Sequence, residues 1–373
     1  MTRTRLFRIV RLICALLALA PVALPAELYA QTAASSQAGS KAPVSRQAVA
    51  APSASGSSER LQLPKKTTTK KISTAAARAR RAKLARARAA SAARALKEAQ
   101  EPRFKLDENG ALVPDIRAEA AIIYNPQTGQ VLWESNSQDQ RSIASITKVM
   151  TAAVFLENSP DLTREVVVQS ADVRRASTTY LRAGYKLTTS DLLHLLLIGS
   201  DNAAARVLAR VSPHGATGFI DRMNDKALEL GLTTTRYADP SGLLAANVSS
   251  AYDMARLIAY VSGDTRISEI MRKQNHSVAV GKRAITVNST NQLVRQGDVD
   301  VLGGKTGFIS KAGYCLATLL RLPQGGPQVA VVVLGAKSNA GRFWETRHLF
   351  NWLSDKAKDL VVGTPVEAAA VAN

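Results

Sequence analysis

The stretch YCLATLLRLPQGGPQVAVVVL, residues 314–334, holds the clearest structural pattern in this chain of 373 residues. Two apolar runs, at 314–322 and 329–334, flank a segment at 323–327 that is rich in Pro and Gly. Apolar runs of this length on either side of such a turn predict a β-hairpin.

The same pattern occurs earlier, where residues 120–124 and 131–133 flank the turn sequence NPQTG. Between the two hairpins the apolar period is mostly helical, as in Leu192, Leu195 and Leu196, and a final helical pattern covers 342–360. Strands at both ends with helices between them predict an α+β fold. We expect an antiparallel sheet closed by the N- and C-terminal parts of the domain, with a helical region inserted.

The net charge of +20 is distributed unevenly. Residues 1–30 carry +3, residues 31–100 carry +13, and residues 101–373 carry only +4. This distribution excludes a uniformly basic, histone-like body. No aromatic residues are interleaved with the basic ones at 31–100, which argues against nucleic acid as a partner.

Residues 1–30 have the composition of a secretory signal peptide. Four arginines precede an apolar run at 12–25, which is shorter than the roughly 20 residues that a spanning helix needs. Small residues at Ala26 and Ala30 offer cleavage sites. We therefore expect an exported, periplasmic protein, with an uncleaved N-terminal anchor as the alternative. Cleavage leaves Cys315 as the one cysteine, so no internal disulfide is expected.

Residues 31–100 consist mainly of Ala, Ser, Thr, Lys and Arg. They are expected to form a disordered basic linker, because so few large apolar side chains cannot offset the ordering entropy. Within the linker, residues 75–99 lack Gly and Pro and are rich in Ala, which favours a transient helix. The linker is either a solvated spacer or an electrostatic attachment to acidic envelope polymers or lipids. A catalytic domain is expected over 101–373.

The first chemical motif is Ser145-Ile146-Thr147-Lys148. The helical period of the apolar residues around it places Ser145 in the first turn and Lys148 one turn later, on the same face. A hydroxyl is a weak nucleophile, and an amine that has lost its proton in a dry site can accept the hydroxyl proton. The motif therefore predicts a nucleophile and its base.

Two triplets follow. The first, Ser200-Asp201-Asn202, comes between two helical patterns, and Asp201 alone is interpreted as a turn residue. The second, Lys305-Thr306-Gly307, opens a strand pattern. Its cation and hydroxyl can hold a carboxylate, and its glycine leaves the strand edge open to a ligand.

Together, in this order, the three motifs are shared by penicillin-binding proteins and class A β-lactamases. From about residue 118 to 360 the chain resembles the low-molecular-mass penicillin-binding proteins, a family of serine D-alanyl-D-alanine carboxypeptidases and endopeptidases. Further matching stretches are SIASITKVMTA at 142–152, DPSGL at 239–243 and KTGFISKAGY at 305–314. The resemblance implies a penicillin-binding/β-lactamase-like transpeptidase fold with a sheet of about five strands. It also implies action on peptidoglycan stem peptides and inhibition by β-lactams.

The resemblance implies catalytic roles for three residues. Ser145 is the acylated nucleophile, Lys148 accepts its proton, and Ser200 passes a proton to the leaving amine.

Five more residues are implied to bind substrate. Asn202 would form a hydrogen bond with the substrate amide. Lys305 and Thr306 of the Lys-Thr-Gly motif would bind the terminal carboxylate of the substrate, beside Gly307. The backbone N–H groups of Ser145 and Phe308 would form the oxyanion hole. No metal or organic cofactor is implied, and the four histidines are scattered without ligand spacing.

The leaving amine distinguishes two activities that share one acyl-enzyme. Carboxypeptidases of this family typically add a β-rich domain and a membrane-binding helix, whereas 66 residues follow Gly307 here and no C-terminal anchor is seen. This layout and residues 308–314 favour a D-alanyl-D-alanine endopeptidase of the penicillin-binding protein 7 type, with a carboxypeptidase as the alternative. A β-lactamase is less favoured, because neither Glu229 nor Glu269 has the Glu-x-x-x-Asn setting of a deacylating base. A non-catalytic wall-binding module is disfavoured by the three intact motifs.

Overall fold

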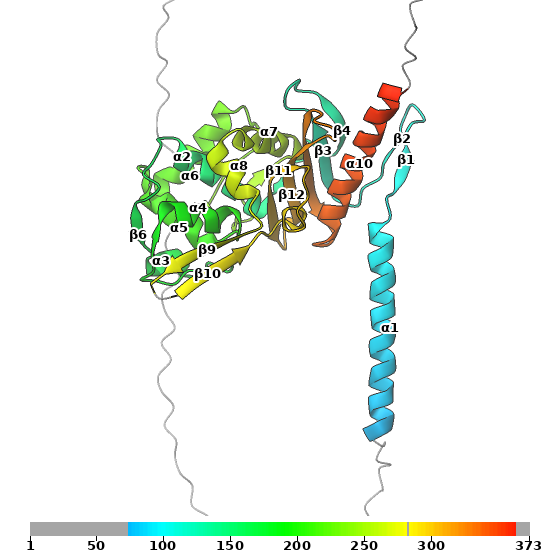
Figure 1. The fold of residues 1–373 in the computed structure, drawn as a ribbon, viewed down its shortest axis with the longest axis horizontal. Coiled ribbons are helices and arrows are strands. Elements are labelled where there is room, and N and C mark those ends of the chain that lie inside the picture. Colours follow the sequence, from blue (N-terminus) through cyan, green and yellow to red (C-terminus); the bar gives the residue numbers. More distant parts are fainter. Residues whose placement is uncertain (1–73, 282, 363–373) are drawn as a thin grey trace, which may run out of the picture. The chain divides into compact units, whose positions relative to one another are not determined.

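A five-stranded antiparallel sheet is the central element of the protein, whose computed structural model describes residues 74–281 and 283–362 (Figure 1). In spatial order its strands are β11 (Val301–Ile309), β12 (Gly313–Arg321), β13 (Gln328–Ala336), β3 (Ala120–Tyr124) and β4 (Val131–Ser135). The predicted α+β fold and both predicted hairpins, β3–β4 and β12–β13, are confirmed. The two hairpins join through β3 and β13, where Ile122 lies opposite Val332.

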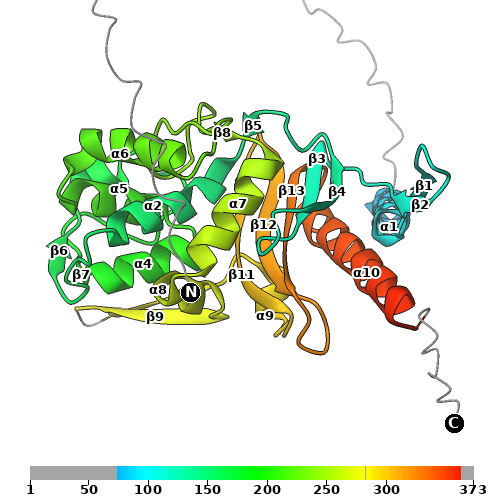
Figure 2. The same cartoon turned by 90° about the horizontal axis from the view of Figure 1, so that it is seen from above.

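Both faces of the sheet are buried. Helix α7 (Ala251–Ser262) covers one face and helix α10 (Gly341–Val362) covers the other (Figure 2). Successive residues of β13 enter opposite cores: Ala330, Val332 and Leu334 on the α7 side, Val329, Val331 and Val333 on the α10 side. Because side chains alternate along a strand, a strand buried on both faces must be apolar throughout.

The predicted helical insertion lies between β4 and β11. Its longer helices are α2 (Thr147–Leu156), α4 (Thr189–Leu197), α5 (Asn202–Val211), α6 (Gly215–Glu229), α7 and α8 (Thr265–Met271), and its short ones are α3 (Ser170–Val173) and α9 (Gln292–Arg295). Every residue of α2 is buried, because α4, α5, α6 and α7 pack around it. Lys148 lies on this buried helix.

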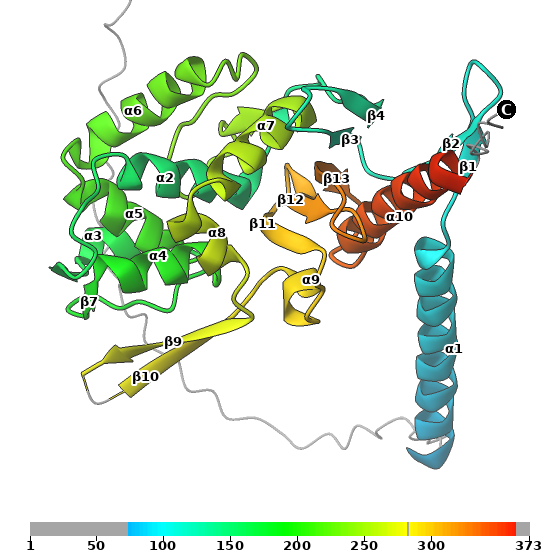
Figure 3. The same cartoon turned by 45° about the horizontal axis from the view of Figure 1, so that its top comes forward.

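The remaining strands form four small antiparallel pairs. They are β1 (Phe104–Leu106) with β2 (Leu112–Pro114), β5 (Arg141–Ser142) with β8 (Val248–Ser249), β6 (Glu165–Val167) with β7 (Lys186–Thr188), and β9 (Asn275–Val280) with β10 (Arg283–Asn288). The β9–β10 hairpin, which the sequence pattern did not predict, lies beside α4 (Figure 3). There the rings of His276 and His194 stack with centroids 3.9 Å apart.

Helix α1 (Thr74–Gln100) lies in the last part of the basic segment, and its bounds lie within a residue of the Ala-rich stretch 75–99, for which the sequence favours a transient helix. The physical reason is the absence of Gly and Pro together with the high helix propensity of Ala. The predicted signal peptide and residues 31–73 lie outside the described residues. Within the described part, no helix combines the length and the apolar character that crossing a bilayer requires.

Candidate active site

Ser145 sits in a short 3-10 helix, η1 (Ala144–Ile146), that leads directly into α2. Two glycines allow its surroundings to close around it. A Cβ on Gly307 of β11 would come within 2.6 Å of the Ile143 carbonyl oxygen, and Gly242 adopts a φ of +78° where its loop meets Ala144. Glycine is therefore required at both positions for the strand and the loop to approach the serine.

Lys148 lies one turn after Ser145 and is completely buried. Its Nζ is 2.8 Å from the Ser145 Oγ, 2.6 Å from the Asn202 Oδ1 and 2.6 Å from the Ser241 carbonyl oxygen. The amide and carbonyl oxygens can only accept, so they take both N–H groups of a neutral amine. The remaining lone pair then faces the Ser145 hydroxyl, which is the arrangement of a base poised to remove its proton.

Burial also lowers the pKa of Lys148 to about 7, against the opposing effect of the negative charges of Asp239 and Asp201. A buried ammonium loses hydration that its neutral form does not need. Near neutral pH, a large fraction of the protein therefore carries the unprotonated amine that the predicted role requires.

The loop beneath Lys148 is held by Asp239. Its carboxylate accepts from the Ser241 N–H at 2.9 Å and the Leu244 N–H at 3.1 Å, and also contacts the Ser241 hydroxyl and the Asn247 amide. This fixes the Ser241 carbonyl that receives the Lys148 N–H. The sequence pattern contained this run as DPSGL, but no role at the site was assigned to it.

Ser200 and Lys305 form a second pair. The Lys305 Nζ donates to the Ser200 Oγ at 2.8 Å and to the Thr306 carbonyl oxygen at 3.0 Å. Burial, with the positive charges of Lys148 and Arg342 nearby, lowers the pKa of Lys305 well below its ordinary value. The Thr306 hydroxyl, on the same strand, donates to the Thr290 hydroxyl at 2.7 Å.

Asn202 has protein partners for both groups of its amide. Its Oδ1 accepts from Lys148, and its Nδ2 donates to the Ala176 carbonyl oxygen at 2.7 Å. In this arrangement Asn202 orients the lysine amine. Its expected bond to the substrate amide stays a prediction.

Asp201 does more than form a turn. Its fully buried carboxylate accepts from the Tyr180 N–H at 2.6 Å, from the Thr179 hydroxyl, and from the Ala204 N–H as the N-cap of α5. Burial raises the pKa of Asp201 despite these donors. The residue ties the loop that carries Ser177 and Thr178 to the start of α5.

These parts surround one cavity of about 420 Å³. Its lining includes the predicted residues Ser145, Ser200, Asn202, Thr306, Gly307 and Phe308. Lys148 and Lys305 reach it through their serine partners. The structure thus brings all eight predicted residues together from η1, α2, the turn before α5, the first turn of α5 and β11.

Arg342 also lines this cavity and was missed by the sequence analysis. Its guanidinium is almost fully buried and donates to the carbonyl oxygens of Gly307 at 3.0 Å and Cys315 at 3.1 Å, which lie on neighbouring strands. Burial lowers its pKa to about 10. A single arginine at the start of a helix belongs to no motif, so no sequence signal pointed to it.

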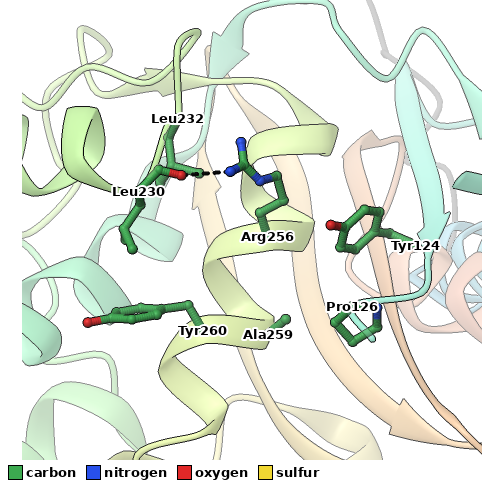
Figure 4. A pocket seen from close by; sticks show the side chains of 7 residues that line it. All are labelled: Tyr124, Pro126, Leu230, Leu232, Arg256, Ala259 and Tyr260. Atoms are coloured by element: carbon green, nitrogen blue, oxygen red, sulfur yellow. Dashed lines mark hydrogen bonds between the residues drawn. The ribbon is translucent and has the colours of Figure 1, made fainter. Parts of the chain in front are cut away.

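A second hollow lies on α7 and contains none of the three motifs (Figure 4). Its arginine, Arg256, is engaged with the carbonyl oxygens of Gly231 at 2.6 Å and Leu230 at 2.8 Å, where α6 ends. Among the described residues, no group of three or more His, Cys, Asp and Glu side chains is arranged to hold a metal ion.

Comparison with known proteins places these features in a family. A family model described as D-alanyl-D-alanine carboxypeptidase matches residues 107–338. A D-alanyl-D-alanine endopeptidase of Haemophilus influenzae is 32% identical over 227 residues, which cover 60% of this chain and 78% of that protein. The D-alanyl-D-alanine carboxypeptidase DacF of Bacillus subtilis is 32% identical over 237 residues, which cover 59% and 58%. The crystal structure of the Streptomyces K15 DD-transpeptidase aligns with a TM-score of 0.60 and 27% identity, over 64% of this chain and 97% of that one.

Proposed function

Because the chain belongs to the D-alanyl-D-alanine carboxypeptidase family of serine peptidases, we propose that it is a peptidoglycan D,D-endopeptidase. It hydrolyses the bond between D-alanine of one stem peptide and the side-chain amine of the neighbouring stem. The observation that carries the proposal is the placement of the Lys148 amine. Two oxygen acceptors take its N–H groups, and its lone pair faces the Ser145 hydroxyl.

Acylation follows from this placement. The Lys148 amine takes the hydroxyl proton as the Ser145 Oγ attacks the D-alanine carbonyl carbon, and the carbonyl oxygen becomes an oxyanion that the N–H groups of Ser145 and Phe308 stabilise. When the tetrahedral intermediate collapses, the C–N bond breaks. The leaving amine receives, through Ser200, the proton that Lys148 took from Ser145, so that Lys148 is neutral again in the acyl-enzyme; Ser200 is held by the Lys305 amine.

Water then completes hydrolysis. Lys148 accepts a proton from the water that attacks the acyl-enzyme, and the Ser145 oxygen leaves with that proton, which restores the starting state. Lys305 and Thr306 hold the substrate carboxylate on β11, and no metal takes part in this scheme.

The preference for crosslinks is supported by the relatives. At equal identity, the matched region spans 78% of the endopeptidase of H. influenzae but 58% of the carboxypeptidase of B. subtilis. Carboxypeptidase action, with terminal D-alanine as the leaving group, is the second candidate, because it uses the same acyl-enzyme.

Penicillins should acylate Ser145, and the resulting penicilloyl-enzyme should be hydrolysed slowly. Among the described residues, those that line the cavity include no carboxylate that could activate water in the way of a class A β-lactamase. Glu229, one of the two glutamates considered from the sequence, is paired with Arg222 on an exposed surface. Rapid turnover of a chromogenic cephalosporin by the purified protein would contradict this part of the proposal.

The deciding experiment incubates the protein with a crosslinked muropeptide dimer and a pentapeptide monomer, with products identified by mass. Loss of the dimer alone supports the endopeptidase, and loss of terminal D-alanine alone supports the carboxypeptidase. Ser145→Ala should abolish both reactions and the covalent labelling by fluorescent penicillin. Labelling that persists in this variant would show that another residue is the nucleophile.

Location and attachment complete the proposal. Residues 1–30 direct export to the periplasm and are cleaved after Ala26 or Ala30, and residues 101–373 form the catalytic domain. The basic segment 31–100 contacts acidic envelope polymers or lipids. Support comes from α1, which carries eight Lys and Arg residues and one Glu and has no apolar stripe.

A further inference from the structure

Phe308 presents an apolar ring to the active-site cavity. It lies in that lining beside Gly307, yet the residue is 49% exposed, which is unusual for phenylalanine. Only its backbone N–H has a role in the proposed mechanism. The ring is therefore an apolar surface beside the nucleophile that the chemistry does not use.

The ring is held in place by its neighbours. Phe308 pairs with Tyr314 across β11 and β12, and the two rings stack with centroids 4.3 Å apart and an angle of 25° between their planes. The Arg342 guanidinium lies 5.6 Å from the centroid of the Tyr314 ring, and the same group bonds the carbonyl oxygens of Gly307 and Cys315. A stack that is anchored in this way presents a fixed wall to a ligand.

The position of the wall follows from the geometry of β11. Thr306 and Phe308 are two residues apart, so their side chains lie on the same face of the strand, separated by about 7 Å. Lys305 and Ser200 mark the end of the cavity where the leaving amine is protonated. Phe308 lies further along β11, followed by Ile309, which also lines the cavity. The apolar wall thus lies further along β11 than Lys305, the residue whose amine contacts Ser200.

We propose that the Phe308 side chain is a specificity-determining element for the acyl donor. It packs against the aliphatic side chain of the stem residue that precedes the attacked D-alanine. This inference rests on the proposed function, and it concerns the half of the substrate that crosslinked dimers and pentapeptides share. The ring therefore selects donors without choosing between endopeptidase and carboxypeptidase action.

The test compares two donors, diacetyl-L-lysyl-D-alanyl-D-alanine and acetyl-glycyl-D-alanyl-D-alanine, by kcat/KM. Phe308→Ala keeps the backbone N–H and should lower kcat/KM for the lysyl donor about tenfold and for the glycyl donor less than twofold. Phe308→Leu, which keeps apolar bulk, should lose about threefold on the lysyl donor. The ratio of dimer to pentapeptide cleavage should not change in either variant.

Tyr260→Ala is the matched control, because this residue is 48% exposed and its ring lines the hollow on α7 (Figure 4). It should leave kcat/KM for both donors unchanged. Titration with fluorescent penicillin gives the concentration of reactive serine in each preparation, and thermal unfolding reports folding. Equal losses on both donors, or a changed ratio of dimer to pentapeptide cleavage, would overturn the inference while leaving the proposed function intact. A wild-type protein that forms no acyl-enzyme would overturn the proposed function itself.

Discussion

At the scale of single residues, the proton affinity of one buried amine sets the working range of the proposed reaction. Lys148 must be neutral to accept the Ser145 proton, and burial brings its pKa to about 7. The protonated enzyme dominates below this value and the competent form dominates above it. The acylation rate should therefore rise as pH increases through about 7.

The corresponding measurement is the second-order rate constant for acylation by benzylpenicillin between pH 5 and 9. It should rise about tenfold per pH unit on the acid side and level off above pH 7 to 8. Lys148→Arg should reduce acylation at least about a thousandfold at every pH, because a guanidinium stays protonated. A rate that falls with pH across the same range would rule out Lys148 as the base.

Asp239 offers a way to move this profile. Its negative charge raises the pKa of Lys148, against the larger effect of burial. Asp239→Asn removes that charge, so the pKa of Lys148 should fall and the rise in acylation rate should shift to lower pH. The exposed carboxylate of Asp161 provides the control, and Asp161→Asn should leave the profile unchanged. A shift to higher pH in Asp239→Asn would mean that the carboxylate acts on Lys148 in another way.

At the scale of elements, the site depends on how closely β11 approaches η1. Gly307→Ala would place a Cβ 2.6 Å from the Ile143 carbonyl oxygen and 3.2 Å from the Ser145 backbone nitrogen, both of them main-chain atoms. The strand must then move away from the serine. We expect acylation by penicillin to fall at least about a hundredfold, because small displacements of reacting groups are costly.

The control for this prediction is Gly218→Ala in α6, where the nearest atom is the His214 Cβ at 3.7 Å. Alanine favours the helix over glycine, so this variant should acylate normally and be slightly more stable. Normal acylation in Gly307→Ala would show that the strand and η1 do not need this close approach.

At the scale of the whole molecule, charge and chemistry belong to different parts of the chain. Deleting residues 31–100 removes +13 of the net charge but none of the residues around the cavity. The shortened protein should acylate with penicillin within twofold of the full chain. Its retention on purified cell walls at low salt should drop about tenfold or more, and retention of the full chain should weaken as salt increases. Equal retention of both forms would assign the basic segment to a spacer.

The sheet could be predicted from the sequence because its two hairpins are apolar runs separated by clear turns. The eight site residues around the cavity could be predicted because they belong to the three motifs. The sequence did not predict the β9–β10 hairpin, whose strands are short and whose core-facing side, with Val278, Val287 and Ile285, also carries Arg283 and His276. Arg342 and Asp239 were missed as site residues for a different reason. Each acts by hydrogen bonding to carbonyl oxygens or N–H groups that only the folded chain brings close to it. No residue spacing in the sequence indicates these contacts.

The pairing of β3 with β13 has a consequence for folding during synthesis of the chain. Ile122 and Val332, which lie opposite each other, are 210 positions apart in the chain. As the ribosome releases the polypeptide from its N-terminus, β3 and β4 emerge long before β13, the strand that pairs with β3. The sheet cannot close on a partial chain, and contacts this distant in sequence form slowly. The sheet of a nascent chain therefore stays open until β13 has been synthesised, and truncation within β13 should yield an insoluble, inactive product.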